Sequence, residues 1–161
     1  MSNWPVDLLV ERADHPVPPQ PDAATALAGL GLLPSLVDFL APLYAVADGA
    51  TYFGGALRVL PMELLPSWNV DEDPRASMPD AARNVLFFLH NSFGDLLGVP
   101  VNDDGDLGPD RLAVLWVDQY KCEFAGRSWG DLMTMILTGE DSTDYFLARR
   151  HDHEWAANHL G

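Results

Sequence analysis

Apolar residues recur every three or four positions in the first part of the chain, which is the spacing of one helix face. The clearest segment covers residues 35–47. It follows Pro34 and contains Pro42, which removes a hydrogen bond and should kink the helix. Two shorter helices are predicted before it. One covers residues 4–10, and an Ala-rich one begins at Asp22, a residue type that often caps helices.

Strand-like patterns replace the helical spacing in the middle of the chain. Four short segments have such patterns: residues 56–60, 84–91, 112–117 and 121–126. The second and third are continuous apolar runs, which predict strands buried on both faces. Residues 98–101 should pair with the 84–91 strand as a hairpin. Pro100 places this partner toward an edge of the sheet, because proline lacks the N–H that a central strand uses.

Helical spacing returns after the strands. Residues 129–136 carry apolar side chains on one helical face, and Ser128 and Asp131 resemble a capping box at its start. Residues 142–160 are expected to form a last helix. The order of helices, strands and helices indicates an α+β fold. We expect one domain over residues 1–161, with a mainly antiparallel four- to six-stranded sheet flanked by N- and C-terminal helices.

The composition fits one soluble domain. The chain has 161 residues, 48% of them apolar, which is enough to bury a core. No apolar run approaches the roughly 18–20 residues that a membrane span needs. Asp and Glu number 24 against 9 Lys and Arg, so the formal charge is −15. This charge argues against binding to nucleic acid or to an anionic membrane, because both attract basic residues. We expect a macromolecular partner to be basic.

The cysteine content and the N-terminal segment bear on location. The single cysteine, Cys122, excludes an intrachain disulfide and favours a reducing compartment. The first thirty residues lack the basic and apolar regions of a signal peptide, and four prolines within residues 15–21 form a stiff connector. We therefore expect a cytoplasmic protein.

Acidic residues concentrate in the second half of the chain. Between residues 71 and 144 there are fifteen acidic and five basic residues. They gather in three loop-like segments: residues 71–73, 103–110 and 140–144. The first belongs to a proline-marked segment, residues 71–80, that predicts an exposed loop. Solubility alone would explain such loops. The functional interpretation is an electrostatic surface for a basic partner.

One run of aspartates resembles part of a calcium-binding loop: Asp103, Asp104, Asp106 and Asp110. An EF-hand loop needs a glycine at its sixth position and a glutamate at its twelfth. With Gly108 as that glycine, Gly105 falls at the third position and Val114 at the twelfth, so the template fails. A solvated acidic turn is the simpler interpretation, and no calcium site is predicted here.

A second group of potential metal ligands lies near the C-terminus: His151, His153, Glu154 and His159. Only His151 and Glu154 have helical spacing, so a solvated tail is the simpler interpretation. Cys122 has no motif around it, and the chain contains neither a nucleophile elbow nor a phosphate loop. We therefore expect a protein without catalytic residues, metal or cofactor.

Several segments resemble, in their order and spacing, the SUKH superfamily. In that family a Leu-Pro pair begins a helix that ends before an Asn/Asp-Gly turn. The matching positions here are Leu33-Pro34, Phe39-Leu40 and Asp48-Gly49. Residues 56–68 are similar to the family's first strand and the segment after it. A Phe-Gly turn between two central strands is matched by residues 93–95, and the closing hairpin and helix by residues 112–137.

The resemblance covers about residues 27–138, leaving a Pro-rich extension over residues 1–21 and a helical one over residues 140–161. The chain departs from the family in residues 66–83, a long insertion, and in lacking the Gly-Gly-Asp that often follows the Phe-Gly turn. The resemblance implies an α+β domain without catalytic activity. Bacterial members are mostly immunity proteins that bind and neutralise polymorphic toxins, many of them nucleases. Fungal relatives regulate cell-wall assembly.

Three functional hypotheses remain open at this point. The leading one is an immunity protein that blocks a basic toxin through an acidic surface containing one aromatic residue: Trp68, Asp71, Glu72, Asp73, Asp103, Asp104 and Asp106. The second is a small-molecule-binding or enzymatic domain whose site is formed in space by four residues: Glu63, His90, Trp116 and Asp118. The third is a regulatory scaffold like the fungal relatives.

Overall fold

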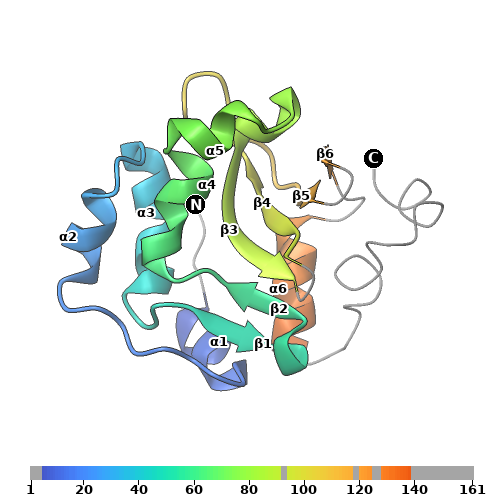
Figure 1. The fold of residues 1–161 in the computed structure, drawn as a ribbon. Coiled ribbons are helices and arrows are strands. Elements are labelled where there is room, and N and C mark those ends of the chain that lie inside the picture. The colour runs from blue at the N-terminus through green and yellow to red at the C-terminus, as the bar shows by residue number, and fades with distance from the viewer. Residues whose placement is uncertain (1–4, 92–93, 118–119, 125–127, 139–161) are drawn as a thin grey trace.

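Six strands follow one another across a single antiparallel sheet in the computed structural model, which describes residues 5–91, 94–117, 120–124 and 128–138 (Figure 1). The strands are β1 (Ala50–Tyr52), β2 (Leu57–Val59), β3 (Val85–Asn91), β4 (Leu96–Pro100), β5 (Ala113–Trp116) and β6 (Lys121–Phe124). Each strand pairs with the next one in sequence, so the order across the sheet is the order along the chain. With helices before and after the strands, the protein is an α+β domain with an antiparallel sheet, as predicted.

Helices precede, interrupt and follow the sheet strands in the sequence. The α-helices of the described residues are α1 (Val6–Arg12), α2 (Ala23–Ala28), α3 (Pro34–Tyr44), α4 (Leu65–Asn69), α5 (Glu72–Ala76) and α6 (Trp129–Thr138). Short 3-10 turns are η1 (Phe53–Gly55), η2 (Met62–Leu64) and η3 (Asp80–Asn84). The four helices predicted from apolar spacing correspond to α1, α2, α3 and α6. The predicted helix at residues 142–160 lies outside the described residues.

Helices α3 and α6 both pack against Phe88 of β3. The Phe88 ring meets Phe39 of α3 edge-on, with ring centroids 5.8 Å apart, and meets Trp129 of α6 in the same way at 5.1 Å. Edge-to-face pairs at this separation add stability beyond their apolar burial. Helix α1 buries Leu9 and in turn contacts α6. Helices far apart in the sequence therefore meet in one layer.

Strand β3 lies in the middle of the sheet and is buried along nearly all of its length, as its continuous apolar run predicts. The ladder between β3 and β4 shifts register between Phe87 and Leu89, which marks a β-bulge. Strand β2 pairs with the C-terminal part of β3 from Leu89 onward. Before that point, the side chain of Asn69 in α4 bonds to the Phe87 backbone instead.

Strand β4 is central, which corrects the prediction that Pro100 would place it near an edge. It pairs with β3 on one side and β5 on the other. Pro100 is the last residue of β4, and the β4–β5 register already ends at Gly98. The Val101 N–H bonds to Asn84 on the β3 side. The Pro100 nitrogen, which carries no hydrogen, therefore faces away from β3. On that side β5 has no residue that pairs with Pro100. The proline costs the sheet no ladder bond.

Local structure differs from prediction at three other helix positions. Residues 71–80, predicted to be a loop, contain the single-turn helix α5. Asp22 precedes α2 but makes no capping bond with its side chain, because its own backbone is left-handed with φ at 51°. Helix α3 ends at Tyr44, three residues before the predicted end at residue 47, and it accommodates Pro42 inside.

The capping box predicted for α6 is confirmed. The Asp131 N–H donates to Ser128 Oγ at 3.0 Å, and the Ser128 N–H donates to Asp131 Oδ2 at 2.9 Å. The shorter aspartate thus makes both reciprocal bonds of the motif, which usually carries glutamate at this position. The capping box fixes where α6 begins and so places Trp129 against Phe88.

Candidate functional site

The loop between β4 and β5, residues 102–110, is called the acidic loop below. Its turn is closed by its own backbone: the Asn102 N–H donates to Asp106 O at 2.7 Å, and the Gly105 N–H donates to Asn102 O at 2.9 Å. The Asp106 N–H also donates to the Asp104 carboxylate at 3.2 Å. The three predicted contact residues on this loop are all exposed to solvent: Asp103, Asp104 and Asp106.

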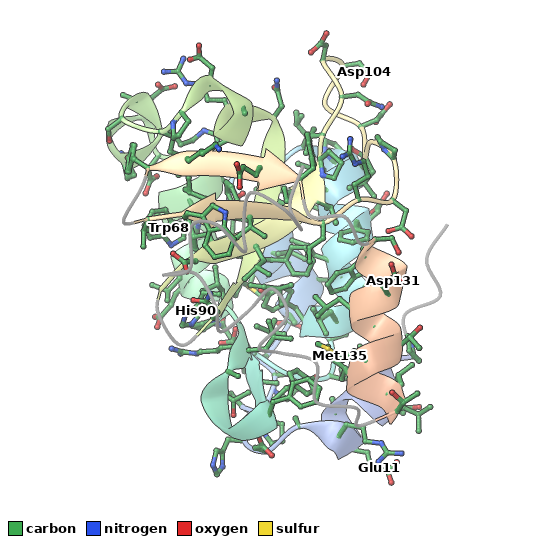
Figure 2. The ribbon with its side chains drawn as sticks, turned by 90° about the vertical axis from the view of Figure 1, so that its right-hand side faces the viewer. Glu11, Trp68, His90, Asp104, Asp131 and Met135 are labelled. Carbon is green, nitrogen blue, oxygen red and sulfur yellow. The ribbon has the colours of Figure 1, made fainter. Side chains whose placement is uncertain are left out.

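The acidic loop is docked on the start of α3 through Gly105. This glycine is buried, has φ at 86°, and lies so close to Leu33 that an added Cβ would be 2.2 Å from Leu33 Cδ1. The Ser35 hydroxyl donates to Gly105 O at 3.1 Å. The left-handed backbone at this position favours glycine, and a larger residue would also displace the exposed end of the Leu33 side chain. The anchored backbone leaves the loop's carboxylates on the outside, and Asp104 lies at the tip in Figure 2.

The second group of predicted contacts lies on α5. Asp71 occupies the N-cap position and Glu72 the first turn, and both side chains are exposed. Asp73 belongs to the same helix, but its side chain lies outside the described part. Figure 1 shows α5 and the acidic loop at the same end of the molecule, and Figure 2 shows them on different sides of that end. The structure thus brings the two acidic segments to one end without placing them in contact.

Trp68 does not lie with the acidic loop. It belongs to α4, is half-buried and packs against the hydrophobic core. Figure 2 shows it well away from Asp104. Part of the side chain is therefore accessible beside α5, while the rest packs against the core. A partner that covers the tip of the acidic loop would have to extend along the molecule to reach it.

Two arginines brace the segment that follows Trp68. Arg75 of α5 donates to Trp68 O at 3.1 Å and to Arg83 O at 2.8 Å. Arg83 of η3 donates back to Ala76 O at 3.4 Å. Burial lowers the pKa of the Arg75 side chain, Glu72 partly offsets this, and the charge of Arg83 adds to the lowering. The sequence contains no motif that would have singled out this pair.

An apolar pocket opens beside the acidic loop. Its volume is about 250 Å³, and it is lined by Phe39, Val99, Leu107, Trp129 and residues 108–110. The acidic loop therefore forms one wall of the pocket, and α3 and α6 provide its aromatic residues. Sequence analysis assigned Phe39 and Trp129 to helix cores, and nothing in their spacing indicated that one cavity would join them.

Asp110 supplies the carboxylate of this pocket. Its side chain is exposed, and Oδ1 accepts a hydrogen bond from the Gly130 N–H in the first turn of α6 at 3.3 Å. A long basic side chain has an apolar stem that packs on aromatic rings and a charged head that stays in water. The pocket offers both surfaces, with Trp129 for the stem and Asp110 for the head.

The alternative site is not assembled by the described residues. Trp116 is fully buried in β5, and its indole N–H donates to Glu123 at 3.2 Å. His90 pairs with Leu96, and Leu96 pairs with Leu115, so His90 and Trp116 lie on opposite faces of the sheet. Glu63 is exposed in η2, and Asp118 lies outside the described residues.

His90 itself is half-buried near the end of β3. Its ring Nδ1 lies 3.0 Å from the carbonyl oxygen of Asn91. Burial lowers the pKa of the His90 imidazole, and the neighbouring Arg58 lowers it further, with a smaller opposing effect from the Asn91 carbonyl. The imidazole is therefore neutral at pH 7, and the described residues offer it no carboxylate ion-pair partner.

A buried polar pair closes the β3–β4 hairpin at the position of the Phe-Gly turn. Asp95 is fully buried, and its carboxylate accepts bonds from Asn91 Nδ2 and from the Val117 N–H, both at 3.0 Å. The Asp95 N–H donates to Asn91 Oδ1 at 3.0 Å. Gly94 adopts φ at 86° in this turn. These bonds give Asp95 a structural role that holds the hairpin against the end of β5.

Sequence analysis predicted no metal site, and His151, His153, Glu154 and His159 were the residues considered for one. Within residues 5–138 as described, no three His, Cys, Asp or Glu side chains are grouped so that they could hold a metal ion. His151, His153, Glu154 and His159 lie outside the described residues. None of the helices in the described part of the chain has both the length and the apolar character needed to cross a bilayer.

No family model, curated protein or solved structure matches this chain in comparisons of sequence and fold. The SUKH resemblance therefore rests on the sequence features given above.

Proposed function

We propose that this chain is a non-enzymatic protein-binding domain whose acidic end binds a basic partner. On the resemblance to SUKH proteins, we further propose that it is an immunity protein and that the partner is a basic polymorphic toxin, such as a nuclease. The free, half-buried thiol of Cys122 fits a protein that works in a reducing compartment such as the cytoplasm.

The observation that carries the proposal is the continuity between the acidic loop and the apolar pocket. Residues 103–106 present three exposed carboxylates, and residues 107–110 of the same loop line a pocket of about 250 Å³. Protein interfaces commonly combine a buried anchor with a polar rim. A basic partner would be attracted by the rim and would place a side chain in the pocket beside Trp129.

The carboxylates of the acidic loop are not neutralised within the described protein. The ion pair found between described residues joins Lys121 and Glu123 on β6, away from this loop. Unpaired surface charges create a potential that steers an oppositely charged partner and speeds association. Charge complementarity of this kind raises association rates to ~10⁸–10⁹ M⁻¹s⁻¹ at low salt.

The test removes the loop charges together. If a large secreted protein is encoded next to this chain's reading frame, its C-terminal domain is the probe. The triple variant Asp103→Asn/Asp104→Asn/Asp106→Asn should bind it at least about tenfold more weakly, mainly through slower association, and should no longer protect co-expressing cells. Asparagine keeps the side-chain acceptor that bonds to the Asp106 N–H, so the loop conformation should persist.

A matched control carries the same charge change elsewhere. Asp7→Asn/Glu11→Gln/Asp38→Asn removes three exposed carboxylates from α1 and α3, and Figure 2 shows Glu11 at the opposite end from Asp104. This control should bind like the wild type. Equal weakening of both variants would mean that overall charge, not the acidic loop, drives binding. A wild-type chain that neither binds nor protects would overturn the immunity proposal.

A further inference from the structure

A second cavity lies beside α5, separate from the apolar pocket. Its volume is about 140 Å³, and Arg75 and Arg83 form part of its wall together with Gly31, Asn69 and Val101. The cavity thus lies between the connection from α2 to α3 and the segment that the two arginines brace. The Asn69 amide is already bonded to Phe87, so the arginines are the cavity's available polar side chains.

The two guanidinium groups are only partly satisfied within the protein, and Glu72 offsets the charge of Arg75 only in part. Every acceptor that they reach is a backbone carbonyl: Trp68 and Arg83 for Arg75, and Ala76 for Arg83. In the described part of the chain neither group forms an ion pair, although the sequence has 24 acidic residues. Arg75 uses two of its five N–H donors and Arg83 uses one in a long bond, so donors remain for a ligand.

We propose that the Arg75–Arg83 cavity is a binding site for a small oxyanion, a phosphate or carboxylate group. Paired guanidiniums match such groups because they supply charge-assisted, bidentate hydrogen bonds. The cavity is well below the roughly 300–1,000 Å³ of sites that enclose drug-sized ligands. It therefore takes one anionic group, either a free ion or the end of a larger molecule. A bound anion would stabilise the charged form of Arg75, which burial and the charge of Arg83 disfavour.

The acidic residues around the cavity limit the affinity that we expect for an anion. The chain's charge of −15 and the nearby Glu72 oppose an anion, but salt screens charges beyond a Debye length of about 8–10 Å. Contact with two guanidiniums acts at much shorter range. The site should therefore be occupied at moderate ligand concentration. It is independent of the acidic loop, because the cavity contains none of the loop's carboxylates.

The test is a titration of the full chain at pH 7 and constant ionic strength, followed by the backbone amide NMR signals of Gly31 and Arg83. Sodium phosphate and sodium acetate are the two probes, with sodium chloride as the balancing salt. Phosphate should produce a saturable shift of both signals. Saturation by acetate as well would assign the site to carboxylates and phosphates alike, and saturation by phosphate alone would assign it to phosphate groups.

Arginine variants connect the shifts to this cavity. Arg83→Gln should weaken binding at least about tenfold, and Arg83→Lys, which keeps the charge but not the forked donors, should weaken it less. Arg83 is exposed, so neither change threatens folding. Arg12→Gln removes a matched exposed charge from α1 and should leave binding unchanged. The proposal fails if neither probe gives a saturable shift, or if Arg83→Gln and Arg12→Gln bind alike.

Discussion

The side chain of Asn69 takes the place of a strand beside Phe87. Asn69 Nδ2 donates to Phe87 O at 2.7 Å, and the Phe87 N–H donates to Asn69 Oδ1 at 2.8 Å. Phe87 is fully buried, and its N–H and carbonyl both face the side of β3 where the pairing with β2 has ended. A side-chain amide places an N–H donor beside a carbonyl acceptor, as a peptide group does, so it satisfies both. Its second N–H donates to Leu65 O within α4 at 2.9 Å. Asn69 thereby ties α4 to the middle of the sheet.

Replacing Asn69 should lower the free energy of unfolding by more than is usual for a residue of a short helix. Asn69→Ala leaves a buried N–H and a buried carbonyl without partners, and we expect a loss of about 3 kcal/mol in the free energy of unfolding. Urea denaturation followed by circular dichroism measures it. Asn69→Asp keeps the acceptor but loses the donor, so it should also destabilise. Asn84→Ala, at an exposed side chain, should change stability by less than about 0.5 kcal/mol. Equal effects of the two alanine variants would contradict the assigned role.

Gly98 should not tolerate a side chain. A Cβ at this position would lie 2.0 Å from Leu86 O and 2.9 Å from Phe87 Cα, so β3 and β4 would have to separate at the bulge. We expect Gly98→Ala to destabilise the protein by about 3 kcal/mol or more. The control is Gly130→Ala in α6, where the nearest atom is the flexible Asp110 carboxylate at 3.2 Å. Thermal unfolding of both variants measures the two effects. A Gly98→Ala protein as stable as the wild type would show that β3 and β4 do not approach each other this closely.

The capping box of α6 should behave as one unit. Ser128→Ala and Asp131→Ala should each cost about 1 kcal/mol. The first removes the acceptor of the Asp131 N–H in the first turn, and the second removes the acceptor of the Ser128 N–H just before the helix. The double variant should cost less than the sum of the two, since either single change already disrupts the reciprocal pair. A double-mutant cycle by chemical denaturation measures this coupling. Strictly additive losses would indicate that the two bonds form independently.

Alkaline pH should destabilise the fold through buried phenols and a thiol. Burial raises the pKa of Tyr52 to about 12 and, with Glu123, that of Cys122 to about 11, and it raises the pKa of Tyr44 as well. The unfolded chain loses these protons near pH 9–10, whereas the folded chain holds them to higher pH. The stability they contribute is therefore fully present below about pH 9 and is lost as pH rises through 11–12.

Tyr52→Phe separates this effect from simple packing. The Tyr52 hydroxyl donates to Leu9 O at 2.8 Å, so the variant should be less stable at pH 7 but should lose less stability between pH 9 and 12. Tyr120→Phe, at an exposed side chain, serves as the control. Urea midpoints at a series of pH values give both slopes. A Tyr52→Phe slope equal to that of the wild type would rule out Tyr52 as a source of the alkaline loss.

Elements that depend on residues close together in the sequence could be predicted from the sequence. The strand predicted from the apolar run of β3 and the Ser128–Asp131 capping box appear in the structure as predicted, and α3 appears with a C-terminal end three residues earlier than predicted. The central position of β4 was missed. The effect of Pro100 depends on where β5 stops pairing, which is set by register between strands and not by the proline itself.

The sequence predicted which side chains of the candidate site are exposed, but not which residues come together to form its pocket. Turn residues correctly indicated that Asp103, Asp104 and Asp106 would be exposed. The pocket beside them needs Phe39 and Trp129, which come from two helices joined only by tertiary packing. The Arg75–Arg83 cavity likewise depends on two short helical turns whose residues showed no periodic signal.

The order of the strands also has a consequence for folding during synthesis. Each strand's partner is the next one to leave the ribosome, so hairpins can form in sequence from β1 to β6 without waiting for distant segments. The helices differ from the strands in this respect, and α1 most of all, because it packs on α6. The first helix of the described chain is therefore made early and can reach its final packing only after α6 has emerged.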